Sequence, residues 1–295
     1  MDVLSNILSA LHLHARVFSH GCYRGEWALD TSGEKRTTFH LLIRGSCWLH
    51  LPEQKEPIAL SGGDLIVFPH DAAHILSNSP QLPKADFPLN LPADPAAEGV
   101  AATLVCGYFH FERCAWNPLL EALPEWIFIR YEESNTLPLM ETLGKFLQYE
   151  LDADNIGVDL VVDKLSEILF INVVRRFVKD YEGGGYIAAL ADKQIGKALS
   201  AVHQNLQEKW SVESLAQVAG MSRSSFAEKF VKLTGHTPMN YLTKWRMTIA
   251  QERLVHEKES VVAVAEASGY QSEAAFSKTF KKHFGYGPGA ARKRG

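Results

Sequence analysis

Residues 215–235 read LAQVAGMSRSSFAEKFVKLTG, and residues 264–285 read VAEASGYQSEAAFSKTFKKHFG, which is a copy of the first stretch. Three positions recur at a spacing of 49 residues, and after one inserted residue, Gln271, five more recur at a spacing of 50. The pairs are Ala216 with Ala265, Gly220 with Gly269, Met221 with Tyr270, Ser222 with Ser272, Phe226 with Phe276, Phe230 with Phe280, Gly235 with Gly285 and Pro238 with Pro288. A short apolar helix, a glycine turn, a capping serine and a second helix are typical of a helix-turn-helix. The sequence therefore predicts two such motifs, at about residues 212–233 and 261–284.

The second helix of each motif is predicted to bury one stripe of large apolar side chains. The stripes are Phe226, Phe230 and Leu233 in the first motif and Phe276, Phe280 and Phe284 in the second. Between the motifs, residues 238–256 read as one continuous helix of nineteen residues, which at ~1.5 Å per residue is about 28 Å long. Successive major grooves on one face of DNA lie roughly 34 Å apart, so this spacer suits two recognition helices on one duplex.

The side of each recognition helix that faces away from the stripe is predicted to meet DNA. Its lysines suit phosphate contacts, which position a protein without reading sequence. Glu228 can accept a hydrogen bond from cytosine N4, or it can pair with Arg223 or Lys232 on its own helix. The candidate DNA-binding residues are Arg223, Ser224, Ala227, Glu228, Lys229, Lys232, Gln271, Glu273, Ala274, Lys278, Lys281 and Lys282.

The charge of the chain is divided unevenly. The formal net charge is −4, but residues 186–295 hold 16 Lys+Arg and 9 Asp+Glu, a balance of +7, whereas residues 1–185 hold 14 and 25, a balance of −11. A basic module joined to an acidic one fits a polyanion-binding domain with a partner domain that does not bind DNA.

The N-terminus gives no sign of membrane insertion or export. Residues 1–18 lack the basic flank and small-residue cleavage site of a signal peptide and read as a short amphipathic helix. The chain contains no run of 18 apolar residues. We expect a cytoplasmic protein with no membrane partner. Its cysteines, Cys22, Cys47, Cys106 and Cys114, are then expected to be reduced at rest.

Residues 1–111 read mostly as short strands separated by turns, with Cys22 ahead of the first strand. The candidate strands are residues 27–29, 37–43, 47–51, 57–60, 64–68, 73–77 and 102–111. Many short strands at this spacing favour a sandwich or a barrel. Residues 80–100 carry five prolines, which predicts a long irregular excursion between two strands.

From about Asn117 the apolar spacing becomes helical. The more apolar of two helices, within residues 158–181, is interpreted as a core helix of its own domain or as a subunit interface in a homodimer, and the two interpretations can both hold. Three glycines, residues 183–185, then suit a flexible linker.

The repeated C-terminal motifs and the helix between them, residues 192–292, resemble the DNA-binding domain of the AraC/XylS family of transcription regulators. The resemblance implies a seven-helix domain that binds promoter DNA and activates transcription with RNA polymerase. It also implies that outward positions on both recognition helices, Ser224, Ala227, Glu228, Glu273, Ala274 and Lys278, contact bases and phosphates. Family members often carry Arg, Gln or Trp there, so Ala227, Glu228 and Ala274 are departures.

The N-terminal stretch GGDLIVFPHDAAHILSN fits a cupin motif at Gly63, Pro69, His74 and Asn78, with Asp71 in place of a glycine. Residues 1–180 thus resemble the cupin-type domain of one branch of AraC regulators. The earlier H-x-H…E metal motif of cupins is incomplete here. His40, His74 and His110 are candidate ligands for zinc or another divalent ion; the alternative is that these histidines satisfy backbone groups or line a pocket.

The surroundings of Cys22 and Cys106 resemble those of cupin-bearing AraC relatives that detect reactive chlorine. By that resemblance these two cysteines would be the redox pair. Our hypothesis is that oxidation of Cys22, with or without a following bond to Cys106, changes how the basic domain is presented. Two alternatives stay open. The cysteines can be inert while the barrel answers to a small organic ligand, or the chain can be a cupin enzyme with a DNA-binding tail.

The fold class predicted from these patterns is a two-domain α+β protein. A cupin-like β-barrel with trailing helices occupies residues 1–182, a linker residues 183–190, and an all-α domain with two helix-turn-helix motifs residues 191–295. We predict a transcription activator rather than an enzyme, with no certain cofactor.

Overall fold

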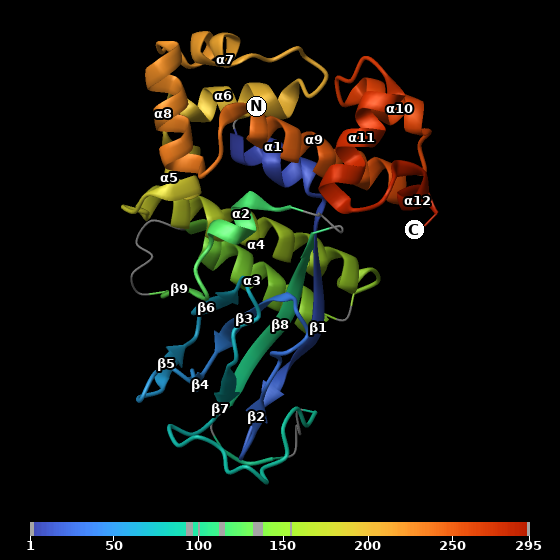
Figure 1. Cartoon of the computed structure of the whole chain (residues 1–295). Coiled ribbons are helices and arrows are strands. Elements are labelled where there is room, and N and C mark those ends of the chain that lie inside the picture. Colours follow the sequence, from blue (N-terminus) through green and yellow to red (C-terminus); the bar gives the residue numbers. More distant parts are fainter. Residues whose placement is uncertain are drawn as a thin grey trace. The chain divides into compact units, whose positions relative to one another are not determined.

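The computed structural model describes residues 3–92, 97–99, 101–111, 116–131, 138–153 and 155–293 (Figure 1). They form two compact units whose sequences interleave. The barrel unit comprises His14–His110 and Leu123–Phe177, and the helical unit comprises Met1–Leu13, Phe111–Ala122 and Val178–Gly295. The predicted two-domain α+β class is therefore confirmed, and Cys114 lies outside the described residues. No helix within the described ranges is both long and apolar enough to cross a membrane.

The barrel unit is built from two antiparallel sheets, ordered β1-β8-β3-β6-β9 and β2-β7-β4-β5. The strands are β1 (Leu13–Tyr23), β2 (Ala28–Leu29), β3 (Thr37–Arg44), β4 (Ser46–His50), β5 (Ile58–Ser61), β6 (Leu65–Phe68), β7 (Ile75–Ser77), β8 (Ala102–Phe111) and β9 (Ile127–Ile129). Each of the predicted strands is present, and β1 and β9 are additional.

The N-terminal prediction needs a correction, because residues 1–18 are not one helix. Helix α1 (Val3–Ala10) ends before His12, where the backbone takes a positive φ of 45°, and strand β1 follows. From Leu13 to Phe18 buried or half-buried side chains alternate with exposed ones, which is the period of a strand rather than of a helix. Cys22 consequently lies within β1, not ahead of the first strand.

Strand β3 is buried on both faces. His40 and Leu42 face the barrel interior, where Leu42 and Cys106 belong to the apolar core shared by the two sheets. On the opposite face Phe39 stacks on Phe109, whose ring lies 4.5 Å from that of Phe170 on α4 (Val158–Asp180). A strand covered on both sides reads as a continuous apolar run, which explains the sequence of β3.

Helix α4 therefore has a core-facing side, which supports the core-helix interpretation; the subunit interface stays a prediction. Val162, Leu165 and Leu169 are buried, whereas Leu160 is 65% exposed and Ile168 is 43% exposed. Helix α3 (Pro138–Ala153) contacts β3 in the same unit.

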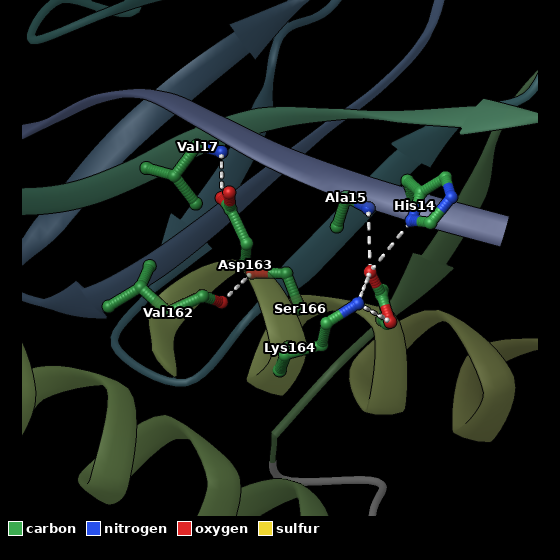
Figure 2. A network of polar contacts seen from close by, with 8 residues as sticks. His14, Ala15, Val17, Val162, Asp163, Lys164 and Ser166 are labelled. Carbon is green, nitrogen blue, oxygen red and sulfur yellow. Dashed lines mark hydrogen bonds and ion pairs between the residues drawn. The ribbon is translucent and has the colours of Figure 1, made fainter. Parts of the chain in front are cut away.

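Two carboxylates of α4 hold the edge strand β1 (Figure 2). The backbone N–H of Val17 donates to Asp163 Oδ1 at 2.9 Å, and that of Ala15 donates to Glu167 Oε1 at 3.4 Å. Lys164 Nζ pairs with Glu167 at 2.8 Å. The N–H groups on the open edge of β1 have no neighbouring strand to bond to. The carboxylates of Asp163 and Glu167 accept these hydrogen bonds instead, which fixes the position of β1 against α4.

The helical unit contains both helix-turn-helix motifs, α7–α8 and α10–α11, joined by α9 (Figure 1). Its helices are α1, α2 (Pro118–Ala122), α5 (Gly185–Ala191), α6 (Ile195–Gln204), α7 (Val212–Ala219), α8 (Arg223–Thr234), α9 (Pro238–Val255), α10 (Val261–Ala267), α11 (Glu273–Phe284) and α12 (Pro288–Arg292). Two segments from the N-terminal half pack here, α1 on α6 and α2 on α5. The domain bounds deduced from sequence remain a prediction; α5 occupies most of the linker proposed there.

Candidate nucleic-acid interface and sensor site

The two motifs are built alike at their turns. Ser222 Oγ accepts from the N–H of Ser225 at 3.3 Å, and Ser272 Oγ accepts from the N–H of Ala275 at 3.2 Å, so both predicted caps are present. The turn ahead of each cap needs a left-handed residue, supplied by Gly220 with φ 66° and Gly269 with φ 76°.

Gly269 has a second reason to be glycine. A Cβ there would lie 2.6 Å from Arg246 Nη2 and 2.9 Å from the carbonyl oxygen of Gln207. The Arg246 guanidinium donates to the carbonyls of Leu206 at 2.8 Å and Glu208 at 2.7 Å. This arginine of α9 thus ties the loop after α6 to the turn of the second motif.

The phenylalanine stripes anchor both recognition helices, α8 and α11. Phe226, Phe230, Phe276 and Phe280 are each 0% exposed. Phe276 and Phe280 share one core with Met247 and other residues of α9. Because the anchors fill one side, the opposite side of each helix is left in solvent.

Most of the predicted DNA contacts lie on that solvent side. The exposed residues are Arg223, Ser224, Glu228, Lys232, Gln271, Glu273, Ala274, Lys278, Lys281 and Lys282. Ala227 and Lys229 are half-buried. The structure thus places nine of the twelve candidates in solvent on α8 or α11, and Gln271 in solvent in the turn before α11.

Lys229 has a structural task. Its Nζ lies 2.7 Å from Asp192 Oδ2 and 3.1 Å from Gln194 Oε1. Burial alone would raise the pKa of Asp192, but hydrogen bonds from Lys229 and from the backbone of Ile195 and Gln194 hold it below its usual value. This lysine therefore joins α8 to the start of α6 instead of standing free for phosphate.

The alternatives for Glu228 are now separable. Arg223 Nε lies 2.8 Å from Glu213 Oε1 on the preceding helix. Glu228 makes no ion pair with any residue that the structure describes. Its side chain is exposed, and the intrahelical pair with Arg223 or Lys232 is not formed among the described residues; contact with a base stays a prediction.

In the barrel, three polar side chains meet at the cupin motif. His40 Nε2 and His74 Nε2 are 2.9 Å apart, and Thr31 Oγ1 lies 3.1 Å from the first and 3.0 Å from the second. His40 Nδ1 is 3.0 Å from Cys106 Sγ, since the register pairs His40 with Cys106 across β3 and β8.

The hydrogen bonds determine the tautomers of both rings. Burial lowers the pKa of His40 well below its usual value, with His74 adding to the effect, and burial also lowers the pKa of His74. Both rings are therefore neutral near pH 7. His74 Nδ1 must donate to the carbonyl of Ala72, at 2.7 Å. Its Nε2 then accepts, so His40 donates from Nε2 and accepts the Cys106 thiol proton at Nδ1.

The predicted third metal ligand does not join this pair. His110 is exposed and lines a different hollow, with Asp163 and Glu167. The residue facing His40 on β8 is Cys106. Among the described residues, no three His, Cys, Asp or Glu side chains are arranged to hold a metal ion, so the residues do not fit the three-histidine set.

The two predicted redox cysteines differ in environment. Cys22 is partly exposed and Cys106 is buried. Burial, with Cys47 nearby, raises the pKa of Cys106, and burial raises that of Cys47 to about 12 with Asp64 contributing. Tyr23 belongs to the same core as Cys106. Because successive side chains of a strand alternate, Cys22 points to the other face of the sheet. A bond to Cys106 consequently requires β1 to shift.

A cavity of about 530 Å³ opens beside Cys106. Its wall includes the buried residues Tyr23, Leu29 and Thr38. Arg36 lies at its rim, with the guanidinium 4.3 Å above the Tyr108 ring. The lining mixes apolar with polar side chains, of which Asp30, Glu34 and Arg36 are charged, and a hollow of this size suits a small molecule.

Sequence reasoning missed several residues that complete these sites. Thr31, Asp163 and Glu167 carry no motif, and only the folded chain brings them to His40 and β1. Trp116, buried against α9, was missed as well. An isolated tryptophan just after a strand was the one signal available for it.

The fold and the exposed recognition helices define a helix-turn-helix transcription regulator. A cupin family model matches residues 2–179, and a helix-turn-helix domain model matches residues 215–294. The HTH-type transcriptional regulator AlkR of Acinetobacter baylyi is 30% identical over 98% of this chain and 98% of its own length. The chain belongs to the AraC family of transcription regulators with an N-terminal cupin domain.

Two further relatives extend the comparison. The RCS-specific HTH-type transcriptional activator RclR of Escherichia coli is 29% identical over 100% of this chain and 98% of its own. Among solved structures, the DNA-binding domain of AdpA in complex with a target DNA is 32% identical, covers 35% of this chain and 92% of that chain, and gives a TM-score of 0.33.

Proposed function

We propose that this DNA-binding regulator activates transcription, that α8 and α11 read one promoter site together, and that a chemical signal received by the barrel unit controls the reading. One observation carries the proposal: two capped, phenylalanine-anchored helices stand on the single helix α9 with their polar sides in solvent. RNA polymerase and a second copy of the chain are the expected protein partners. We propose no catalytic role.

Among the exposed residues of α8 and α11, we assign some to phosphate contacts and one to a base contact. Lys278, Lys281 and Lys282 are exposed on α11 and suit phosphates. Each phosphate contact releases counterions, so DNA affinity should fall steeply as salt rises. Glu228, exposed on α8 without an ion pair among the described residues, is assigned to a base edge.

The test compares Glu228→Ala with Lys281→Ala. We expect Lys281→Ala to weaken binding about equally on all duplexes and to reduce the salt slope by about one. Glu228→Ala should instead relax preference at one base pair by roughly 1–3 kcal/mol. Selection from a random duplex library at fixed salt measures both. An unchanged preference for Glu228→Ala would remove this residue from base reading.

For the signal, we propose oxidation of Cys22 by a reactive chlorine species. The relative RclR is named as specific for such species. Cys22 is the more accessible of the two candidate thiols, and it lies on the strand that follows α1 of the helical unit. Hypochlorous acid would convert the thiol to a sulfenyl chloride with loss of water, and the Cys106 thiol would then displace chloride, giving a disulfide and HCl.

A second candidate signal is a small organic molecule in the cavity beside Cys106. The buried wall of that cavity carries neutral side chains, so the enclosed part of such a molecule should be uncharged. One experiment separates the candidates. Cys22→Ser should abolish hypochlorite-induced transcription if the thiol is the sensor, whereas Cys47→Ser should not. If Cys22→Ser still activates transcription after hypochlorite, the oxidant proposal is wrong, and a small molecule in the cavity remains as the candidate signal.

A further inference from the structure

Trp116 is buried in the helical unit, although in the sequence it follows soon after strand β8 of the barrel unit. Strand β8 ends at Phe111, and Trp116 lies five residues later at 6% exposure. Its ring makes edge contacts with two residues of α9, Tyr241 at 5.2 Å and Trp245 at 6.4 Å between centroids, and with His236 at 5.5 Å. Tyr241 and Trp245 are each 0% exposed.

The polar surroundings of Trp116 hold it in this place. Its Nε1 donates to Glu121 Oε2 at 3.0 Å, which joins the ring to α2. Lys244 Nζ lies 4.8 Å from the ring centroid, a cation–π contact. One side chain thereby connects the α2 segment to neighbouring residues on two adjacent turns of α9.

The far side of the same aromatic cluster is also fixed. Tyr241 OH bonds to Tyr186 OH at 2.7 Å and to His203 Nε2 at 2.9 Å. Trp116 thus covers one side of an aromatic cluster whose other sides are formed by α5, α6 and α9. We expect removal of its ring to expose Tyr241 and Trp245 to solvent and to remove the contacts that hold α9 on that side.

Helix α9 is the part of the unit where orientation matters for reading DNA. It contacts α8 of the first motif and α10, α11 and α12 of the second. A small rotation of α9 therefore changes the separation and angle of the two recognition helices, while each motif keeps its own phenylalanine core.

We propose that Trp116 is a positioning residue for DNA binding: it holds α9, and through α9 the relative placement of α8 and α11. This positioning role rests on the function proposed above, in which α8 and α11 read one site together.

The test uses the full chain and three duplexes. One is selected by the wild-type protein from a random library, and in each of the other two one half-site is scrambled. We expect Trp116→Ala to lose at least tenfold of the preference for the intact duplex over the scrambled ones, while its affinity for the scrambled duplexes stays within about threefold of wild type. Trp116→Phe should restore most of the preference, because an aromatic edge remains.

Trp126→Ala is the matched control, since Trp126 packs on the barrel core instead. Its preference for the intact duplex should equal that of wild type. An equal loss on all three duplexes, or an undiminished preference, overturns the proposal. If Trp116→Ala does not fold, Trp116→Leu replaces it in the test, because leucine fills part of the same space without an aromatic ring. The same outcomes then support or overturn the proposal.

The same three duplexes separate this positioning role from the proposed function. If wild type itself shows no preference for the intact duplex over either scrambled one, the joint reading by α8 and α11 fails. If wild type shows the preference and Trp116→Ala keeps it, only the positioning role fails.

Discussion

At the scale of single residues, His203 makes the stability of the helical unit depend on pH. Burial lowers its pKa to about 3, against 6.5 in the unfolded chain. Between these values the unfolded state binds the extra proton, so stability is complete above pH 6.5 and falls as the pH is lowered. At pH 5 the loss attributable to His203 is about 2 kcal/mol relative to pH 7.5.

Denaturant unfolding of wild type and His203→Gln at both pH values measures this loss, because other titrating groups cancel in the difference. Wild type should lose about 2 kcal/mol more than the variant between pH 7.5 and 5. Parallel pH dependences would show that His203 is not held neutral.

Residues that a repeat or a local rule specifies were predictable. Ser222, Ser272, Gly220 and Gly269 recur at matched positions, and their roles as caps and turns are local. The metal set was not predictable in this way. It depended on the register of β8, which places Cys106 rather than a histidine opposite His40.

At the scale of elements, α4 controls the edge strand β1. Asp163→Ala removes the acceptor for the N–H of Val17, and a lost hydrogen bond of this kind is worth about 1–2 kcal/mol. Exchange of the Val17 amide should therefore accelerate by roughly 5- to 30-fold. Asp163→Asn keeps a carbonyl oxygen there and should exchange nearly as wild type; equally slow exchange in Asp163→Ala would show that β1 is held by other contacts.

Strand prediction succeeded where apolar stretches were bounded by turns, as for β3, β6 and β8. It failed for β1, because the apolar residues after His12 were interpreted as a continuation of α1, although the backbone leaves the helix before His12. The exposed polar side chains of β1 belong to an edge strand, so no continuous apolar run marks it.

At the scale of the whole molecule, the chain order and the compact units do not coincide. The sequence divides naturally near its three glycines, yet α1 and the Trp116 segment belong to the helical unit. Charge and repeats identify the C-terminal half as the DNA-binding part, but they carry no information about distant segments that pack on it. Because the units interleave, the chain passes between them four times: at residues 13–14, 110–111, 122–123 and, within the last turn of α4, 177–178.

We propose that α8 and α11 read one duplex from the two ends of α9. Methylation interference and hydroxyl-radical footprinting of the wild-type protein on a selected promoter duplex measure this. We expect two patches of major-groove contact on one face of the DNA, centred about 10–10.5 base pairs apart. A single patch per bound protein, or two patches on opposite faces, would contradict it.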